Sequence, residues 1–404
     1  MRLLTALSDT DELLGAQVCL YRHGRLLVDA AAGRMGPVDP RPVGSDALFQ
    51  LFEAGAAVLA ALALQQTTDG QLRLAAPVAS VWPEFGAAGK GTITLLELLS
   101  HRIRLSDGLP PGAGMSEVCD ADAMAHCVAA ARAREGGAGA GSDAPWGWAM
   151  WGLLQSVSGG ASVEALLADR ICTPVGVPTH PATTELALAV PAGTAAAEAR
   201  VAMHDASALM RRSGMDLAEV LTAPPPEAEA EAEAEAEEAE GGGEAAAGGG
   251  LQSMMGGVRG MLAPPFLNMT KLRHARLPGS SMHASARALA TVYHGIGSGQ
   301  LLPAELVDGL VAHREATADQ PGVRWAAGFQ LGLCIDSGGR VHTMLGHGSS
   351  GGAVGLCVPE AGVALAMTVS KLSPSGAATR RVVEAMLGEL GLKIDHADGL
   401  LGKA

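Results

Sequence analysis

The sequence predicts an α+β protein, in which strands from both ends of the chain form one antiparallel sheet and helices occupy the middle. Two apolar runs near the N-terminus flank a short turn-forming tripeptide. The last third of the 404-residue chain alternates short apolar runs with Gly, Pro, Asp and Ser, as in an antiparallel meander. Helix signals lie between these regions, and this order of elements is typical of α+β folds.

The first predicted element is a β-hairpin over residues 15–29, with its turn at Arg22-His23-Gly24. A helix is predicted from about Glu53 to Asp69, because Gly70 readily takes the left-handed conformation that ends helices. Two further short helices are predicted after Thr94, which forms a capping-box pattern with the glutamate three residues on, and over Ser162–Arg170.

Four strands and a closing helix are predicted in the last third. The strands are Trp325–Ile335, Arg340–Leu345, Ala353–Val358 and Gly362–Ser370. The helix is predicted because apolar residues recur at helical spacing, at Val382, Val383, Met386, Leu387 and Leu390. We expect the N-terminal hairpin and this meander to join in one sheet.

Most of the formal net charge of −14 comes from one segment of the chain. Nine glutamates lie between Glu227 and Glu244, so the rest of the chain carries only −5. No basic stripe is present to neutralise phosphates, which argues against nucleic acid as a partner. The Glu/Ala/Gly-rich residues 224–250 have no apolar face, and we expect a disordered insertion; an acidic interaction segment is the alternative.

Six cysteines lie far apart and form no Cys-x-x-Cys pair. The N-terminal residues lack a long apolar signal core, and no apolar run reaches 18 residues, so no membrane span is expected. These features favour a soluble intracellular protein, with the cytoplasm as the best hypothesis, and reduced cysteines that act as small apolar residues. A single disulfide is the alternative.

Two motif strings occur around His347 but lack their structural context. Gly346-x-Gly348-x-x-Gly351 matches a dinucleotide fingerprint, which requires a helix after the glycines. Gly348-x-Ser350-x-Gly matches a nucleophile elbow, which requires a strand-to-helix turn. A strand is predicted next in both cases, so neither function is expected. The sequence also has no P-loop string and no closely paired histidine ligands, so we expect no cofactor and no metal.

Four long segments, in order along the chain, carry a family resemblance. They are ALFQLFEAGAAVLAALALQQTTDGQLRLAAPVASVWPEFGAAGKGTITLLELLSHR, WGLLQSVSGGASVEALLADRICTPVGV, HARLPGSSMHASARALATVYHGIGSGQLL and MLGHGSSGGAVGLCVPEAGVALAMTVSKL. Together they resemble the serine β-lactamase-like family, particularly its class C-related β-lactamases and esterases. The resemblance implies a β-lactamase/transpeptidase-like fold in one domain over residues 10–395. Its α/β part is expected at about 10–52 and 275–395, and its helical part at about 53–274.

The family's chemistry uses three elements. A Ser-x-x-Lys opens the nucleophile helix, and the Lys helps to deprotonate the Ser. A Tyr opposite them relays a proton, and a Lys-Thr-Gly or His-Gly-Gly type triplet on a strand supplies part of the oxyanion hole. In this sequence the first element falls on Glu53 and Ala56, the second on Trp146, and the third on His347-Gly348-Ser349.

The nucleophile, its Lys and the relay Tyr are therefore all replaced. None of the five lysines follows a serine by three positions, so no Ser-x-x-Lys exists anywhere in the chain. The two tyrosines, Tyr21 and Tyr293, lie in the predicted hairpin and in a helix-like stretch. An indole donates one hydrogen bond but does not exchange a proton near neutral pH.

The candidate residues also have structural interpretations. Glu53 is favoured by the helix dipole at a first turn; the functional alternative is a general base or nucleophile that acts with His347. His347 is interpreted as a hydrogen-bonded strand-end residue rather than a ligand contact, and His101 as structural. Trp146 and its neighbouring tryptophans, Trp148 and Trp151, either fill the vacated site or line a cleft for an apolar ligand.

The leading functional hypothesis is a catalytically inactive binding or scaffold member of this family. The alternative is an active ester or amide hydrolase with a non-standard nucleophile, Ser349 or Ser350. A product without a selected function is the third hypothesis. A small ester, amide or apolar molecule is the expected ligand class.

Overall fold

The computed structural model describes residues 2–105, 113–135, 144–212, 262–312, 315–316, 324–349, 351–395 and 399–401. The acidic segment 224–250 lies outside these residues. The main-sheet strands are β1 (Gly15–Arg22), β2 (Arg25–Gly33), β8 (Glu315–Ala316), β9 (Arg324–Ala326), β10 (Phe329–Asp336), β11 (Val341–Gly348), β12 (Val354–Val358), β13 (Val363–Val369) and β14 (Leu392–Asp395). Their order is β2-β1-β13-β12-β11-β10-β9-β8, and β14 pairs with β10.

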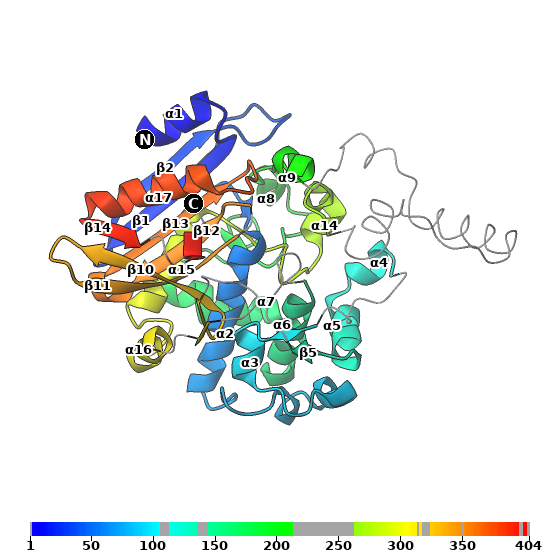
Figure 1. The fold of residues 1–404 in the computed structure, drawn as a ribbon. Coiled ribbons are helices and arrows are strands. Elements are labelled where there is room, and N and C mark those ends of the chain that lie inside the picture. Colours follow the sequence, from blue (N-terminus) through cyan, green and yellow to red (C-terminus); the bar gives the residue numbers. More distant parts are fainter. Residues whose placement is uncertain are drawn as a thin grey trace, which may run out of the picture.

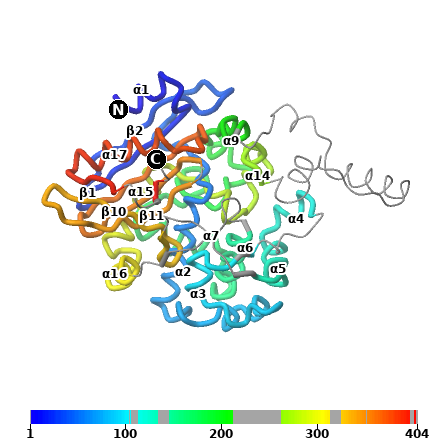
Figure 2. The backbone as a smooth tube through the Cα atoms, in the orientation of Figure 1, coloured from blue at the N-terminus to red at the C-terminus, as the bar shows by residue number. Residues whose placement is uncertain are grey.

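The two ends of the chain meet in this sheet, as predicted. The antiparallel pairing of β1 with β13 runs from Ala16 opposite Val369 to Arg22 opposite Val363. Figure 2 shows the N-terminal strands, in blue, beside the orange C-terminal strands. Together with the helices between them, this sheet confirms the α+β class.

The helices between residues 56 and 212 form most of the region beside the sheet (Figure 1). They are α2 (Ala56–Thr68), α3 (Leu95–Leu99), α4 (Met115–Val118), α5 (Ala121–Ala130), α6 (Ala144–Val157), α7 (Val163–Leu166), α8 (Ala195–Glu198) and α9 (Ser207–Arg212). A 3₁₀ turn, η1 (Phe52–Gly55), leads into α2, and a π-helical turn, η5 (Leu167–Cys172), extends α7. Later helices are α14 (Thr270–His274), α15 (Ala286–Gly297), α16 (Ala304–Ala312) and α17 (Ala377–Glu389).

Local sequence signals account for several boundaries. The hairpin turns at His23 and Gly24, whose φ angles of 47° and 76° are those of a type I′ turn. The Thr94 hydroxyl accepts from the Glu97 N–H, and the Glu97 carboxylate accepts from Thr94, so the predicted capping box is present at α3. Gly70 follows α2 with φ 74°, as the helix prediction requires.

Two predictions about the strands and termini are wrong. The run Trp325–Ile335 is not one strand but two, β9 and β10, because Ala327 and Gly328 form a turn with φ angles of 45° and 92°. A Cβ at Gly328 would lie 2.3 Å from the Ala60 Cβ of α2, so close packing requires the glycine. The hairpin is also not the first element of the chain: a helix, α1 (Arg2–Asp9), precedes it and buries Leu4 and Leu7. Its stability comes from packing on β2 and α17, which sequence periodicity does not reveal.

Helices cover both faces of the sheet. On one face α1 and α17 pack over the inward residues of β1, which are Ala16, Val18 and Leu20. On the other face α15 packs on β1, β12 and β13, and the hydrophobic core between them continues into α2 and α6.

All six cysteines are free thiols, and burial raises the pKa of Cys19, Cys172 and Cys357 to about 12.

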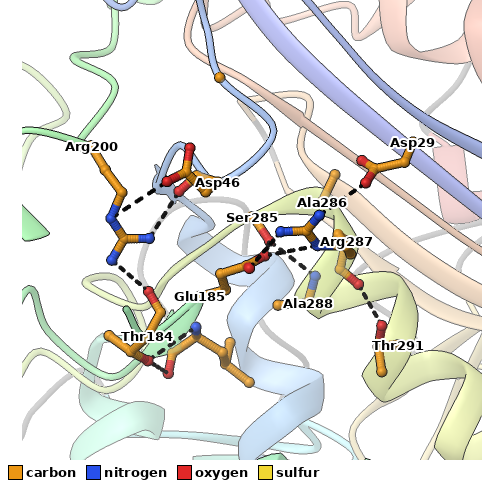
Figure 3. Close-up of polar contacts among 12 residues, drawn as sticks. Asp29, Asp46, Thr184, Glu185, Arg200, Ser285, Ala286, Arg287, Ala288 and Thr291 are labelled. Atoms are coloured by element: carbon orange, nitrogen blue, oxygen red, sulfur yellow. Dashed lines mark hydrogen bonds and ion pairs between the residues drawn. The ribbon is translucent and has the colours of Figure 1, made fainter. Parts of the chain in front are cut away.

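A polar network joins the sheet, α15 and a small second sheet. That sheet has the order β3 (Phe49–Gln50), β7 (His283–Ala284), β6 (Leu186–Ala187), and a separate pair links β4 (Ile103–Arg104) to β5 (Arg134–Glu135). The Glu185 carboxylate accepts from the Ser285 hydroxyl at 2.6 Å and from Arg287 at 2.6 Å. Arg287 also pairs with Asp29 of β2 at 3.1 Å (Figure 3). The carboxylate of Glu185 is nearly buried, with 9% of its side chain exposed.

Arg287→Ala should lower the free energy of unfolding by about 2 kcal/mol. Removal of one partner leaves a buried carboxylate unpaired, although Arg287 is itself one-third exposed, which reduces the cost. The matched control is Arg381→Ala, which breaks an exposed ion pair with Glu12 and should cost less than about 1 kcal/mol. Urea denaturation measures both. Equal losses in the two variants would show that the network does not stabilise the junction.

Candidate functional site

The first candidate element lies where η1 leads into α2. Glu53 is in the 3₁₀ turn, and Ala56 is the first residue of α2 and is fully buried. Glu53 therefore lies in the turn before α2 and not in the first turn of the helix itself, which contains no acidic residue. The η1 turn lies against β11, the strand that carries the third candidate element.

The second and third elements meet in an aromatic cluster of Trp146, His101, Trp325 and His347. The Trp146 indole stacks on His101 with ring centroids 4.7 Å apart. His101 contacts Trp325 at 4.5 Å, and Trp325 meets His347 edge-on at 5.3 Å. All four side chains are buried. The cluster therefore joins α6 and the turn after α3 to strands β9 and β11.

Trp146 has no polar group left for a reaction. Its indole N–H donates to the Leu98 carbonyl at 2.9 Å. This bond anchors α6 to α3 and uses the one hydrogen that an indole donates.

The other two tryptophans of α6 do not join the cluster. At 100° per residue, Trp148 and Trp151 lie on different sides of the helix from Trp146. Trp148 is fully buried, and the Trp151 indole donates to Asp122 of α5 at 2.6 Å. The three tryptophans therefore do not share one face of α6, and Trp148 and Trp151 belong to the packing of the helical region.

His101 occupies an unusual backbone position for a buried aromatic residue. Its φ angle is 53°, and its side chain lies between Trp146 and Trp325. Burial lowers the pKa of His101 from 6.5 to about 3, so the imidazole is neutral at physiological pH. These contacts agree with a structural role for His101.

The third element ends β11 in a tight turn. His347 Nδ1 lies 2.9 Å from the Gly348 carbonyl oxygen, and the Gly348 N–H donates to Gln330 Oε1 at 2.9 Å. The Ser349 hydroxyl accepts from the Ala353 N–H at 3.0 Å. Ser350 lies outside the described residues. Both Gly348 and Ser349 also line a pocket of about 210 Å³ that opens beside the first turn of α17.

Both tyrosines contact residues outside the three candidate elements. Tyr293 is fully buried in α15, where its ring packs so closely on Gly355 that a Cβ there would lie 2.2 Å away. Burial raises the pKa of Tyr293 well above its ordinary value, so its phenol stays protonated. Tyr21 bonds to Thr291 at 3.1 Å and stacks on His294.

Two of the lysines are equally committed. The Lys90 ammonium is buried and donates to the carbonyls of Ala87 at 3.0 Å, Ala129 at 2.8 Å and Ala131. Lys371, which follows β13, pairs with Asp11 at 2.7 Å. The Lys90 amine is therefore held by backbone carbonyls, and the Lys371 amine by an ion pair.

Sequence reasoning missed Trp325, which bridges His101 and His347. Nothing in the local pattern marks this tryptophan, since it is the apolar residue of a short strand.

Among the described residues, no group of three or more His, Cys, Asp or Glu side chains is arranged to hold a metal ion. The described helices also include none long and apolar enough to cross a membrane.

Stability should fall as pH decreases below about 6.5. An unfolded histidine takes up a proton near that pH, whereas buried His101 does so only near pH 3, and His204 and His283 only near pH 4. The unfolded state therefore binds more protons, and each histidine contributes a slope of about 1.4 kcal/mol per pH unit within its window.

Urea denaturation at pH 7.5, 6, 5.5 and 5 measures this slope. His101→Asn keeps a residue that tolerates positive φ and should remove one proton's share of the slope, whatever its effect on absolute stability. An unchanged slope in this variant would contradict the neutral buried state of His101.

Comparison with known proteins identifies the family and the fold of the chain. The Beta-lactamase family model matches residues 2–387. The chain is 28% identical over 369 residues to the Esterase/beta-lactamase LipL of Mycobacterium tuberculosis, which covers 89% of this chain and 77% of that protein. A penicillin-binding protein homologue from Caulobacter crescentus has a TM-score of 0.69 at 23% identity, covering 96% of this chain and 95% of its own. A family VIII carboxylesterase gives 0.67 at 20% identity, with 94% of both chains covered. The chain therefore belongs to the beta-lactamase family and has its β-lactamase/transpeptidase-like fold.

Proposed function

We propose that this protein is a binding or scaffold member of the beta-lactamase family that does not form an acyl-enzyme. The observation that carries the proposal is the lack of a Ser-x-x-Lys anywhere in the sequence. Glu53 and Ala56 stand at the start of the helix where the family resemblance expects the Ser and the Lys. Loss of a nucleophile or its base alone typically removes orders of magnitude of rate.

The contacts of Trp146 support the same conclusion. The indole fills the expected position of the relay tyrosine, stacks on neutral His101 and donates its hydrogen to Leu98. No proton moves through these contacts near neutral pH. The Gly348 N–H, in the triplet that would supply oxyanion-hole donors, already bonds to Gln330.

A second candidate function is hydrolysis of an ester or amide by a non-standard nucleophile. It is favoured by the relative whose name describes an esterase/beta-lactamase. The nucleophile would be Ser349 or Ser350, or Glu53 acting with His347. The Ser349 hydroxyl accepts a hydrogen bond inside the β11–β12 turn, which occupies one of its two lone pairs and leaves its own hydrogen to donate.

The purified protein should not hydrolyse a chromogenic cephalosporin or p-nitrophenyl butyrate above the buffer rate. The triple variant Glu53→Ser, Ala56→Lys, Trp146→Tyr should acquire measurable turnover, because it restores the nucleophile, its base and the relay together. Spectrophotometric rates measure both.

The matched control is Glu53→Ala, Ala56→Met, Trp146→Phe, which makes similar steric changes without the reactive groups. Circular dichroism verifies that both variants fold, since Ala56 is fully buried. Wild-type turnover that disappears in Ser349→Ala, Ser350→Ala or Glu53→Gln would reject the inactive assignment and identify the nucleophile.

A further inference from the structure

A second cavity lies behind the aromatic cluster. It has a volume of about 200 Å³ and is bounded by α3, α16 and the β9–β10 turn. Most of its wall is aliphatic or aromatic, from Leu74, Leu96, Leu306, Leu310 and Trp325. None of the candidate positions Glu53, Ala56, Trp146 or His347 lines it, so it is distinct from the candidate site.

The cavity contains one buried hydroxyl that lacks a partner. Ser100, at the C-cap of α3, lines the cavity and is 1% exposed. Its Oγ has no hydrogen-bond partner among the residues that the structure describes. A buried hydroxyl without a partner is destabilising, so a bound molecule that formed a hydrogen bond with it would recover that free energy.

Size and charge restrict the ligand. An apolar cavity of about 150 Å³ accommodates benzene, so about 200 Å³ holds a single ring with one or two further atoms. Glu305 of α16 lines the cavity and is exposed. Its carboxylate disfavours an anionic ligand. Within the described part of the chain, the other lining residues include no cation that would compensate a negative charge.

We infer that this cavity binds a small uncharged molecule with one ring and one hydroxyl group, which Ser100 holds by a hydrogen bond. The inference concerns a site separate from the candidate catalytic positions, and it holds whether or not the protein hydrolyses esters. Because Trp325 lines the cavity and also contacts His101 and His347, the ligand would lie against the back of the aromatic cluster.

Isothermal titration of the full chain with three probes tests the chemistry. Benzyl alcohol should bind with a dissociation constant on the order of 1 mM or tighter. Toluene, which lacks the hydroxyl, should bind more weakly, and benzoate should not bind. Ser100→Ala should weaken benzyl alcohol binding about tenfold, the effect of one hydrogen bond, and leave toluene binding unchanged.

A blocking variant tests the location. Gly309 of α16 lines the cavity, and a Cβ there would meet no atom within 4 Å, so Gly309→Met should fold normally and abolish binding of both uncharged probes. The matched control is Gly388→Met in α17, another helical glycine with open space, which should bind as the wild type does.

Saturable binding of benzyl alcohol that Gly309→Met removes and Ser100→Ala weakens would establish the site. The inference is overturned if the wild type binds neither uncharged probe, if benzoate binds as well as benzyl alcohol, or if Gly309→Met binds normally. Equal affinity of Ser100→Ala and wild type for benzyl alcohol would also overturn it, because the hydroxyl contact defines the ligand class.

Discussion

The positions of the other strands and of the helices packed on them depend on the antiparallel pairing of β1 with β13, which joins segments about 350 residues apart. Gln17 of β1 shows how far its influence extends. Its side chain donates to the Gly44 carbonyl at 2.6 Å and accepts from the Ala286 N–H of α15 at 2.9 Å. A slip of one residue would turn the apolar side chains of β1 away from α17 and break both of these contacts.

This pairing also determines where the candidate elements meet. With β13 in place, β12 and β11 follow in order, and the end of β11 lies against the turn before α2. Trp146 and His101 from the helical region then meet Trp325 and His347 from the sheet. Aromatic pairs of this kind contribute about 0.5–1.5 kcal/mol each. The junction between the sheet and the helical region is thus held by the packing of four buried rings.

Local signals in the sequence predicted much of the fold. The Arg22-His23-Gly24 turn and the Thr94 capping box depend on neighbouring residues only, so their patterns were sufficient. The order of family-like segments predicted the positions of Trp146 and His347, and the structure places both in one cluster. Whether these positions are catalytically inactive stays a prediction.

Long-range packing explains what the sequence did not reveal. The turn at Gly328 is required by the approach of Ala60, which is more than 250 residues away in the chain. Trp325 belongs to the cluster because β9 lies beside the turn after α3, and no short motif encodes that contact. Likewise, the sequence does not show that the Ser100 hydroxyl lies at a cavity, because residues of α3, α16 and β9 that are distant in the chain form that cavity together.

The central claim is that the family fold is present without its acyl-transfer chemistry. Intact-protein mass spectrometry after incubation with a fluorophosphonate probe tests it most directly, since the probe labels activated serines whatever the natural substrate. We expect the mass of the wild-type protein to remain unchanged. A stoichiometric adduct that maps to a single serine, such as Ser349 or Ser350, would contradict the account.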